Sequence, residues 1–404
     1  MKNILIINQP LNNRGDEAAH RSFILTLAKD HPDANFEVLF SNANDDSINQ
    51  FKVDCQNVKY TNFKNYSKGS YRIKKWALRL NMLRLSLFYP SHYSFSRKIK
   101  KSDFVICAPG GICMGPFQDW QHIYWLTIAK LYRKKTAYYS RSFGPFKETN
   151  KWDRVFKRVS INLLNYFQFI SIRDSKSQIL GDKLKIKYVP SIDSAFLTTP
   201  QTNIPTKIKK QIGDDKFAVF VPNELTWHPT FKKTNPEYLE NFYLKIINSI
   251  AETCNIKTIV MLPQLFNSPI NDQRYFEKLK KKTKQKIVVV EDKYSSNIQQ
   301  SIISKSEIVI GGRYHSIVFA INNKKPFVAL SYEHKVEGLL YLIKLEKHMY
   351  NIENLAQNEK DLNNEIKIIN QLLQDAKESP KAKYEAKKIA KNCMSIFNKD
   401  FLKL

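Results

Sequence analysis

Residues 3–41 read "NILIINQPLNNRGDEAAHRSFILTLAKDHPDANFEVLFS", and this stretch decides the fold. It begins with a nearly continuous apolar run, as expected for a strand that is buried on both faces of a parallel sheet. After a polar loop, Ala19, Phe23 and Leu27 recur at helical spacing, and Asp16 is placed to cap the start of that helix. A second apolar run ends the stretch, so we predict one β-α-β unit with parallel strands.

The same alternation continues along the chain. Similar apolar runs, which predict further strands, recur within 103–111, 135–146, 167–175 and 186–196. They predict a first Rossmann-like domain over 1–195, and a polar, proline-containing linker follows it. The alternation then restarts and predicts a second Rossmann-like domain over 215–345, and 352–404 is predicted as a C-terminal helical segment. The predicted fold is therefore α/β, with two Rossmann-like domains facing a cleft.

Composition limits the class of protein. The chain has 404 residues, of which 43% are hydrophobic, which is enough for two domains. We expect no transmembrane span and no signal peptide, and the five scattered cysteines favour a reducing cytoplasm over disulfides or a zinc cluster. The formal net charge of +28 indicates polyanionic surroundings, namely nucleic acid, anionic lipid or phosphorylated substrates. A general drift of the composition towards lysine is the alternative cause.

The stretch "EIVIGGRYHSIVFAI" contains the strongest candidate for a binding site. Residues 307–310 read as a strand, and Gly311 and Gly312 form a turn where a ligand could approach the backbone. Arg313 and His315 then lie on the first turn of a helix, where backbone N–H groups and the helix dipole favour anions. Arginine adds a forked donor for phosphate or carboxylate, and histidine can move a proton near neutral pH. The stretch therefore predicts an anion site with a group for acid-base chemistry.

Other strand ends supply further candidates. Arg173 and Asp174 follow a strand and precede a helix, so Arg173 is either a second anion contact or part of a structural Arg–Asp pair. Gly15 and Asp16 follow the first strand, and Asp16 either caps the helix or accepts a proton from a hydroxyl. Lys335 is another cation after a strand, with an ordinary solvated lysine as the alternative.

Glycines mark another of these loops. A chain with only 11 glycines places Gly110, Gly111 and Gly115 in the loop "CAPGGICMGPF". Because glycine lets another group approach the backbone closely, the loop is predicted to contact a ligand or the neighbouring domain.

A basic amphipathic segment is predicted over 60–101. Between Asp54 and Asp103 there are 12 lysines and arginines and no acidic residue. Within it, "YRIKKWALRLNMLRLSLFY" is interpreted as one helix that lies on an anionic membrane surface. The residues predicted to face the membrane are Arg72, Lys74, Lys75, Trp76 and Arg79. A core helix with solvated lysines is the alternative, and we expect no nucleic-acid partner because no recognition motif is present.

Taken together, the ordered motifs resemble the polysaccharide pyruvyl transferase family. The matching pieces are "NRGDEAA", "PGG", "SFGPF", "RDSKS", "PSIDSAF", "LPQ", "GGRYHSIVFAINNKKPFVALSY" and Lys335, in the family's order over residues 3–338. The family is similar to two-domain glycosyltransferases of the GT-B type. The family's Arg-x-His motif falls on Arg313 and His315, and its Arg-Asp motif falls on Arg173. Tyr314 stands between the two charged residues where the family often has leucine.

The resemblance implies transfer of the pyruvyl group of phosphoenolpyruvate to two hydroxyls of one sugar, which forms a pyruvate ketal. It implies phosphoenolpyruvate contacts from the second domain and acceptor contacts from the first, with His315 and Asp16 as catalytic residues. The predicted phosphoenolpyruvate contacts are Arg173, Gly312, Arg313, His315 and Lys335. The predicted acceptor contacts are Asn13, Gly15, Asp16, Gly110 and Gly111. Neither a metal nor a cofactor is expected, because arginines can hold the phosphate.

The expected acceptor is a saccharide on a polyprenyl diphosphate carrier, and the expected location is the cytoplasm, peripheral on the inner face of the plasma membrane. Two other functions stay open at this point. One is a GT-B glycosyltransferase that uses a nucleotide sugar. The other is a non-enzymatic protein that binds a membrane surface or a polyanion.

Overall fold

Two parallel sheets organise the chain, and we describe them from a computed structural model that covers residues 2–41, 43–63, 67–200, 202–266, 271–357 and 361–403. The predicted basic segment 60–101 therefore includes three residues, 64–66, that lie outside the described residues. The chain divides into two compact units. The first contains 1–11, 16–197 and 387–404, and the second contains 12–15 and 198–386.

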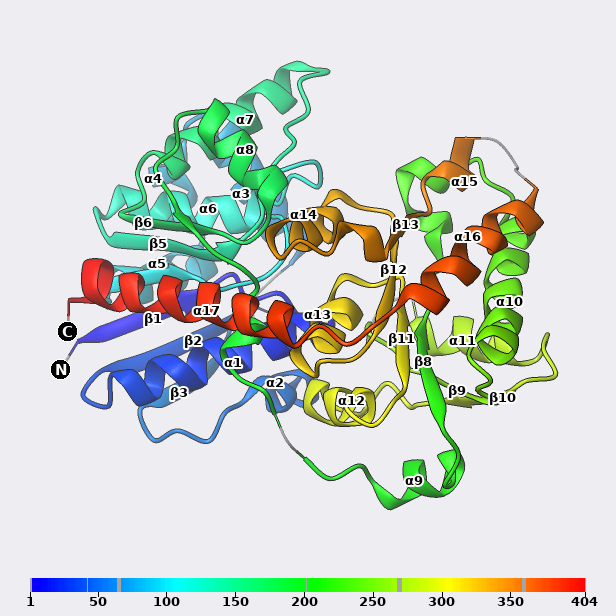
Figure 1. Cartoon of the computed structure of the whole chain (residues 1–404). Coiled ribbons are helices and arrows are strands. Elements are labelled where there is room, and N and C mark those ends of the chain that lie inside the picture. Colours follow the sequence, from blue (N-terminus) through cyan, green and yellow to red (C-terminus); the bar gives the residue numbers. More distant parts are fainter. Residues whose placement is uncertain are drawn as a thin grey trace. The chain divides into compact units, whose positions relative to one another are not determined.

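The first unit has a seven-stranded sheet in its described residues, with the order β3-β2-β1-β4-β5-β6-β7 and all pairs parallel. This order reverses direction between β1 and β4, as in a doubly wound Rossmann sheet, and helices cover the sheet on both faces (Figure 1). The strands are β1 (Asn3–Ile7), β2 (Asn35–Ser41), β3 (Val58–Phe63), β4 (Phe104–Cys107), β5 (Lys135–Arg141), β6 (Phe169–Ile172) and β7 (Val189–Pro190). The helices are α1 (Arg14–Asp30), α2 (Asp45–Phe51), α3 (Lys68–Arg79), α4 (Leu83–Ser86), α5 (Pro90–Lys101), α6 (Trp120–Leu131), α7 (Lys151–Leu164) and α8 (Ser175–Lys183).

The second unit repeats this topology. Over its described ranges it has a six-stranded parallel sheet, β10-β9-β8-β11-β12-β13, whose order reverses between β8 and β11. The strands are β8 (Phe217–Val221), β9 (Thr258–Met261), β10 (Lys286–Val289), β11 (Ile308–Gly311), β12 (Phe327–Ser331) and β13 (Met349–Asn351). The helices are α9 (Thr206–Ile212), α10 (Pro236–Thr253), α11 (Asp272–Lys280), α12 (Ser296–Ile303), α13 (Tyr314–Asn322), α14 (His334–Leu342), α15 (Asn354–Gln357) and α16 (Leu362–Asp375). The prediction of two Rossmann-like α/β domains is confirmed.

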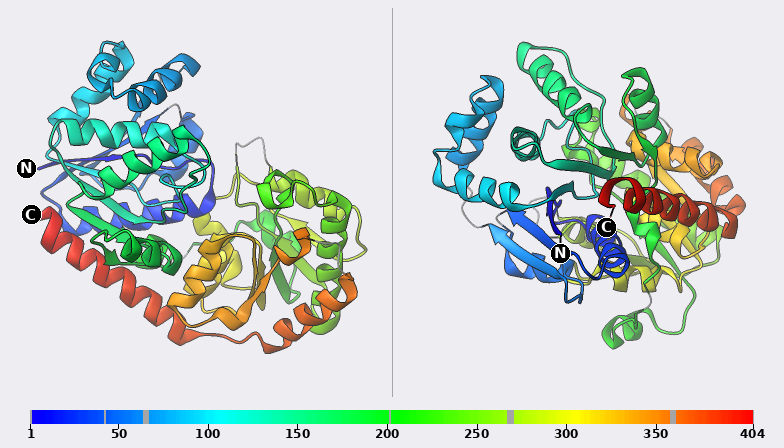
Figure 2. Two further views of the ribbon diagram at one scale, coloured as in Figure 1. Left: turned by 90° about the horizontal axis from the view of Figure 1, so that it is seen from above. Right: turned by 90° about the vertical axis from the view of Figure 1, so that its left-hand side faces the viewer.

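The predicted C-terminal helical segment, 352–404, divides between the two units. Helix α16 belongs to the second unit, whereas the end of α17 (Pro380–Ile396) and the residues after it belong to the first. Phe397 packs among Phe23, Tyr139 and Phe169, with ring centroids 4.9–6.2 Å apart. Figure 2 shows this last segment, in red, ending beside the N-terminus. The end of the chain is therefore part of the core of the first unit.

The predicted long helix in the basic segment is wrong, because the chain turns at Asn81. Asn81 has a left-handed backbone with φ of 56°, and the N–H of Met82 donates to the carbonyl of Ala77 at 2.8 Å. This is the hydrogen bond of a helix that ends in a Schellman motif. Helix α3 therefore stops, α4 is a single short turn, and Pro90 begins α5 at the position where proline is favoured.

Three of the five predicted membrane-facing residues are not presented as predicted. Lys74 is buried, with its ammonium 4.7 Å from the Trp125 ring centre. Arg79 places its guanidinium 4.4 Å from the ring centre of Trp152 and 5.1 Å from that of Trp120. Cations stack on indole faces in this way when they are withdrawn from water.

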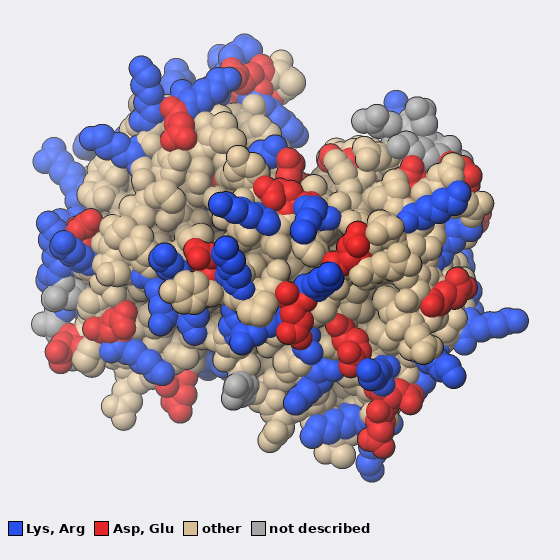
Figure 3. Space-filling view, viewed as in Figure 1, with Lys and Arg blue, Asp and Glu red and all other residues tan. Residues whose placement is uncertain are grey.

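Lys75 is the third of these residues, and it is only half exposed. Arg72 and Trp76 are exposed, as predicted. None of the helices in the described ranges is long and apolar enough to cross a bilayer. Figure 3 shows lysines and arginines spread over the whole of the face in view rather than gathered in one patch.

Candidate active site

In each sheet, the point where the strand order reverses is where an open α/β sheet binds ligands, at the carboxyl ends of the strands. In the second unit this point lies between β8 and β11. The predicted residues Arg313 and His315 directly follow β11, so the second unit presents them at that edge.

Arg313 is the N-cap residue of α13 and is only 7% exposed. One of its terminal nitrogens donates to one carboxylate oxygen of Asp272, and the other oxygen of Asp272 accepts the backbone N–H groups of Gln264 and Leu265. Burial lowers the pKa of Arg313, but the charge of Asp272 and the neighbouring Tyr332 outweigh burial and raise it. Its Nε–H has no acceptor among the described residues. Arg313 is thus a fixed cation with one donor that is unpaired among the described residues.

His315 lies in the first turn of α13 and is 6% exposed. Its imidazole lies directly over the Cα of Gly15, where a Cβ atom would collide with the ring. Tyr314 packs edge-on against the imidazole, with ring centroids 4.9 Å apart and planes at 89°. Gly15 and Tyr314 together fix the ring, which gives Tyr314 a place that the sequence did not suggest.

The two glycines before Arg313 serve packing inside the second unit. The N–H of Gly312 donates to the carbonyl of Val221 at 2.8 Å, so it is already used. A Cβ on Gly311 would collide with Ser316 and Ile317. The Gly312 N–H is therefore engaged within the unit, and the approach of a ligand to the backbone at these glycines stays a prediction.

Asn223 is a residue of this edge that the sequence analysis missed. It follows β8, is 1% exposed, and lies beside Gly312, whose missing Cβ would be 3.7 Å from the Cβ of Asn223. Neither the nitrogen nor the oxygen of its side-chain amide has a partner in the part of the chain that is described. A buried amide left unpaired costs about 1–3 kcal/mol for each group. Such a residue at a ligand-binding edge indicates a donor and an acceptor reserved for a ligand.

Lys335 lies in the first turn of α14, after β12. Its ammonium is 2.6 Å from a carboxylate oxygen of Glu333. Burial raises the pKa of Glu333, but Lys335 outweighs burial and holds the pKa below its usual range. Lys335, a predicted anion contact, is therefore paired with the carboxylate of Glu333 in this structure.

The segment before α1 belongs to the second unit, although the sequence analysis assigned it to the first domain. The N–H of Arg14 donates to the carbonyl of Gln264 at 2.8 Å, and Asn13 forms an antiparallel bridge with Leu265. Asn13 also caps α1, because its side-chain oxygen accepts the N–H of Gly15 at 2.8 Å. The prediction that Asp16 is the N-cap is therefore wrong.

In the first unit, Asp16 and the glycine loop come together. Asp16 is half buried, and its carboxylate oxygen would be 3.3 Å from a Cβ on Gly110. Gly110 has φ of 154° and lies against Pro10, so a side chain there would be both strained and blocked. A Cβ on Gly111 would meet no atom within 4 Å, so the space beside Gly111 is open. Two of the predicted acceptor contacts, Asp16 and Gly110, therefore lie side by side.

Arg173 is enclosed in the first unit and is 2% exposed. It donates to Asp193, which is fully buried, and to the hydroxyl of Ser142 at 3.3 Å. Asp174 caps α8 instead, because it accepts the N–H of Ser177 at 2.8 Å. The predicted alternative, a structural Arg–Asp pair, therefore forms with Asp193 rather than with the adjacent Asp174.

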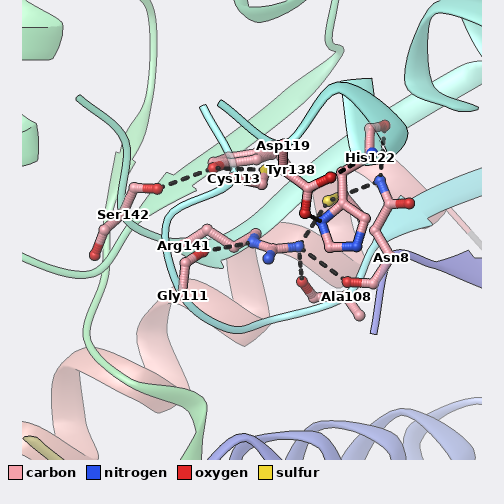
Figure 4. Close-up of polar contacts among 10 residues, drawn as sticks. Asn8, Ala108, Gly111, Cys113, Asp119, His122, Tyr138, Arg141 and Ser142 are labelled. Atoms are coloured by element: carbon pink, nitrogen blue, oxygen red, sulfur yellow. Dashed lines mark hydrogen bonds and ion pairs between the residues drawn. The ribbon is translucent and has the colours of Figure 1, made fainter. Parts of the chain in front are cut away.

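Arg141 is a second buried arginine of the first unit, and the sequence analysis missed it. It ends β5 and reaches back to the point where the order of the strands reverses (Figure 4). Its guanidinium donates to the carbonyls of Asn8, Ala108 and Gly111 at 3.0–3.2 Å and to the sulfur of Cys107 at 3.1 Å. Arg141 therefore ties the loops after β1 and β4 together, and these loops carry the predicted glycines.

Figure 4 also shows Cys113 and the pair of Asp119 and His122 near Arg141. Burial raises the pKa of the Cys107 thiol, but Cys113 and the charge of Arg141 outweigh burial and lower it to about 6. His122 places Nδ1 3.1 Å from a carboxylate oxygen of Asp119, the residue that caps α6. An imidazole held by a carboxylate can accept a proton from a hydroxyl. The signal in the sequence was "DWQH", a cap residue with histidine three positions on.

Comparisons with known proteins agree with this geometry. The family model described as Polysaccharide pyruvyl transferase matches residues 13–334. A similar protein, the amylovoran biosynthesis protein AmsJ of Erwinia amylovora, is 24% identical over 393 residues, covering 88% of this chain and 89% of that protein.

Two UDP-N-acetylglucosamine 2-epimerase structures resemble the whole chain. The enzyme of Neisseria meningitidis gives a TM-score of 0.58 at 12% identity and covers 100% of both chains. The enzyme of Methanocaldococcus jannaschii gives 0.59 at 11% identity and covers 99% of this chain and 100% of the other. At such identities the likeness concerns the fold alone, and it confirms the predicted GT-B-like class.

Proposed function

Because this chain belongs to the polysaccharide pyruvyl transferase family, we propose that it transfers the pyruvyl group of phosphoenolpyruvate to two hydroxyls of one sugar during synthesis of a cell-surface polysaccharide. The family match covers most of the chain, and the similar protein of Erwinia amylovora is an amylovoran biosynthesis protein. The finer parts of the proposal are the donor, the ketal product and the carrier of the acceptor.

The main support for phosphoenolpyruvate as the donor comes from the start of α13. Arg313 presents a buried cation with a free Nε–H, and His315 follows it on the first turn of the helix. Phosphoenolpyruvate carries a phosphate and a carboxylate, and both suit a guanidinium and the N-terminus of a helix. The buried amide of Asn223 at the same edge supplies one more donor and one acceptor. We assign Arg313 and Asn223 to binding and His315 to proton transfer or to stabilising the leaving phosphate.

The reaction balances without a further reagent. The C2–O bond to phosphate breaks, and two C2–O bonds to the sugar form. The π bond between C2 and the methylene carbon is lost as that carbon gains one hydroxyl proton and becomes a methyl group, and the other hydroxyl proton leaves with phosphate. Asp16, which is half buried beside Gly110, is the proposed base for an acceptor hydroxyl. The proposal invokes no bound metal or cofactor.

Arg173 changes role in this proposal. Since Asp193 and Ser142 engage its guanidinium, direct contact with phosphoenolpyruvate would require that pair to open. We therefore assign Arg173 to holding the end of β6 in place. Gly312 and Lys335 remain proposed neighbours of the donor.

We further propose that the acceptor is a saccharide on a polyprenyl diphosphate carrier. The enzyme would then act at the inner face of the plasma membrane. The basic segment of the first unit supports this location, because it holds 12 lysines and arginines and no carboxylate between Asp54 and Asp103.

The test is mass spectrometry of lipid-linked and synthetic glycosides after incubation with phosphoenolpyruvate or with nucleotide sugars. We expect one glycoside to gain one pyruvic acid less one water, with phosphoenolpyruvate only. The Arg313→Lys variant should lose this product, because lysine keeps the charge but lacks the fork. Arg274→Lys, an exposed arginine of the same unit, is the matched control and should keep it. Transfer of a hexose from a nucleotide sugar would instead establish the glycosyltransferase alternative, and no product with any donor would favour the non-enzymatic one.

A further inference from the structure

The segment from α3 to α5 exposes an unusual number of large apolar side chains. Eleven large apolar residues are exposed in the described part of the chain, and six of them lie between residues 76 and 93. We call these six the α3–α5 apolar surface: Trp76, Leu80, Met82, Leu85, Phe88 and Tyr93. Phe88 is 84% exposed, the most of all eleven. These six lie within 18 consecutive residues, and exposed apolar side chains that gather on one surface mark an interaction site, whereas scattered ones do not.

The inner side of the same segment is firmly packed, so the exposure does not come from a loose loop. Phe95 stacks on Trp125 with ring centroids 3.7 Å apart. Ser86 shares a hydrogen bond of 2.7 Å with the hydroxyl of Tyr124, and His92 bonds the carbonyl of Ser86 at 3.1 Å. The segment is therefore anchored on α6 and holds its outer residues in fixed positions. Figure 2 shows α3 to α5, in blue to cyan, at the outer edge of the first unit.

Charge decides which partner fits this surface. The segment has no carboxylate from residue 55 to residue 102, while Arg72, Arg84 and Arg97 are exposed within it. Lys100 and Lys101 are also exposed, at the end of α5. If this surface paired with the same surface of a second copy, these cations would face the same cations, and their repulsion would oppose self-association. An anionic bilayer offers a negative headgroup layer for the cations and an acyl layer for the apolar residues.

We propose that the α3–α5 apolar surface docks on an anionic lipid bilayer, with Leu85 and Phe88 inserted and Arg72 and Arg84 at the headgroups. This surface differs from the membrane-facing helix face predicted from the sequence, because Lys74 and Arg79 lie against tryptophan rings. A need for the enzyme to work at a membrane follows from the proposed function, in which the acceptor is lipid-linked. The docking itself rests only on the exposed side chains and the charge of this segment.

The test is sedimentation of the full chain with vesicles of phosphatidylcholine, with and without 30 mol% phosphatidylglycerol. We expect binding to the anionic vesicles only, and at least a tenfold loss of partitioning in the double variant Leu85→Gln, Phe88→Gln. The matched control is Ile179→Gln, Tyr384→Gln, which changes two residues that are 61% and 66% exposed outside the segment. It should bind like the unchanged protein. A variant with Arg72→Gln and Arg84→Gln should bind more weakly and with less dependence on salt.

Two outcomes would overturn the docking proposal. The first is equal vesicle binding by the Leu85→Gln, Phe88→Gln variant and the unchanged protein. The second is a wild-type dimer in sedimentation velocity that this variant dissolves, with no vesicle binding, because the occupant would then be a second copy. Leu80→Gln, Met82→Gln provides an independent pair if the first variant fails to fold. Turnover of a water-soluble glycoside with phosphoenolpyruvate should stay unchanged in all these variants. Absence of pyruvyl transfer to soluble and lipid-linked glycosides alike in the unchanged protein would refute the proposed function and not the docking.

Discussion

The substitution Gly15→Ala places a methyl group where the imidazole of His315 now lies. Gly15 is the second residue of α1, and its φ lies outside the left-handed region, so alanine suits the backbone. The nearest atoms to the new Cβ are three atoms of the His315 ring, so the ring has to leave its position. The perturbation thus acts on His315 without changing His315 itself.

The expected effects on stability and on activity differ widely in size. Replacing glycine with alanine inside a helix stabilises by up to about 1 kcal/mol. Extra volume that forces buried side chains to move costs about 1–3 kcal/mol. The free energy of unfolding should therefore fall by no more than about 3 kcal/mol, which leaves most of the protein folded. Loss of positioned acid-base catalysis lowers kcat by about 10²–10⁴-fold.

The assay compares kcat for pyruvylated product and the midpoint of urea unfolding in the variant and in a matched control. Gly69→Ala is that control, because Gly69 is also the second residue of its helix and its new Cβ would only touch the Ser67 hydroxyl, at 3.6 Å. Gly69→Ala should leave kcat unchanged. If Gly15→Ala kept full turnover at unchanged stability, then His315 would not act from the position described.

Three further changes test other parts of the account. Asn223→Ala should weaken phosphoenolpyruvate binding about tenfold in titration calorimetry, and unchanged affinity would contradict this. Thermal melts should show equal or higher stability, because the substitution removes a buried unpaired amide. Asp193→Asn should lower the free energy of unfolding by about 3–5 kcal/mol in urea titrations, because it leaves the Arg173 charge buried with one partner less; a loss under 1 kcal/mol would mean that the pair is not buried as described. Burial lowers the pKa of Lys74 to about 7, so above pH 7 the unfolded chain keeps a proton that the folded chain releases. The free energy of unfolding should therefore rise by about 2 kcal/mol from pH 7 to pH 9 relative to Lys74→Met, and parallel pH profiles of the two proteins would refute this.

The strand pattern predicted both sheets because each buried parallel strand is a local apolar run. Two of the four edge strands, β3 and β13, escaped prediction. β3 reads "VKYTNF", is half buried along its length, and has no continuous apolar run; β13 has only three residues. Edge strands lack the burial on both faces that creates the pattern.

The predicted long amphipathic helix failed for a different reason. Its apolar spacing was real, but a single residue, Asn81, ends the helix in a left-handed conformation. Periodicity reports on faces and not on where a chain turns. The charge of the segment could be read from the sequence, whereas the exposure of Leu85 and Phe88 needed the fold.

The residues of the candidate site also differ in whether the sequence could predict them. Arg313 and His315 could be predicted because both follow one strand and start one helix. The partners Asp272, Gly15 and Asp193 could not, because they lie 41, 300 and 20 residues from the side chains that they hold or support. Asn223 gave no local signal, since a polar residue after a strand is ordinary until its burial is known.

The central claim is that phosphoenolpyruvate gives its carbon skeleton to a sugar. Phosphoenolpyruvate labelled with ¹³C at all three carbons tests it directly, with mass spectrometry of the glycoside product and a phosphate assay on the same sample. The account predicts a product that carries all three labels, and one inorganic phosphate released for each product. A product without label, or a sugar transferred from an added nucleotide sugar, would contradict it.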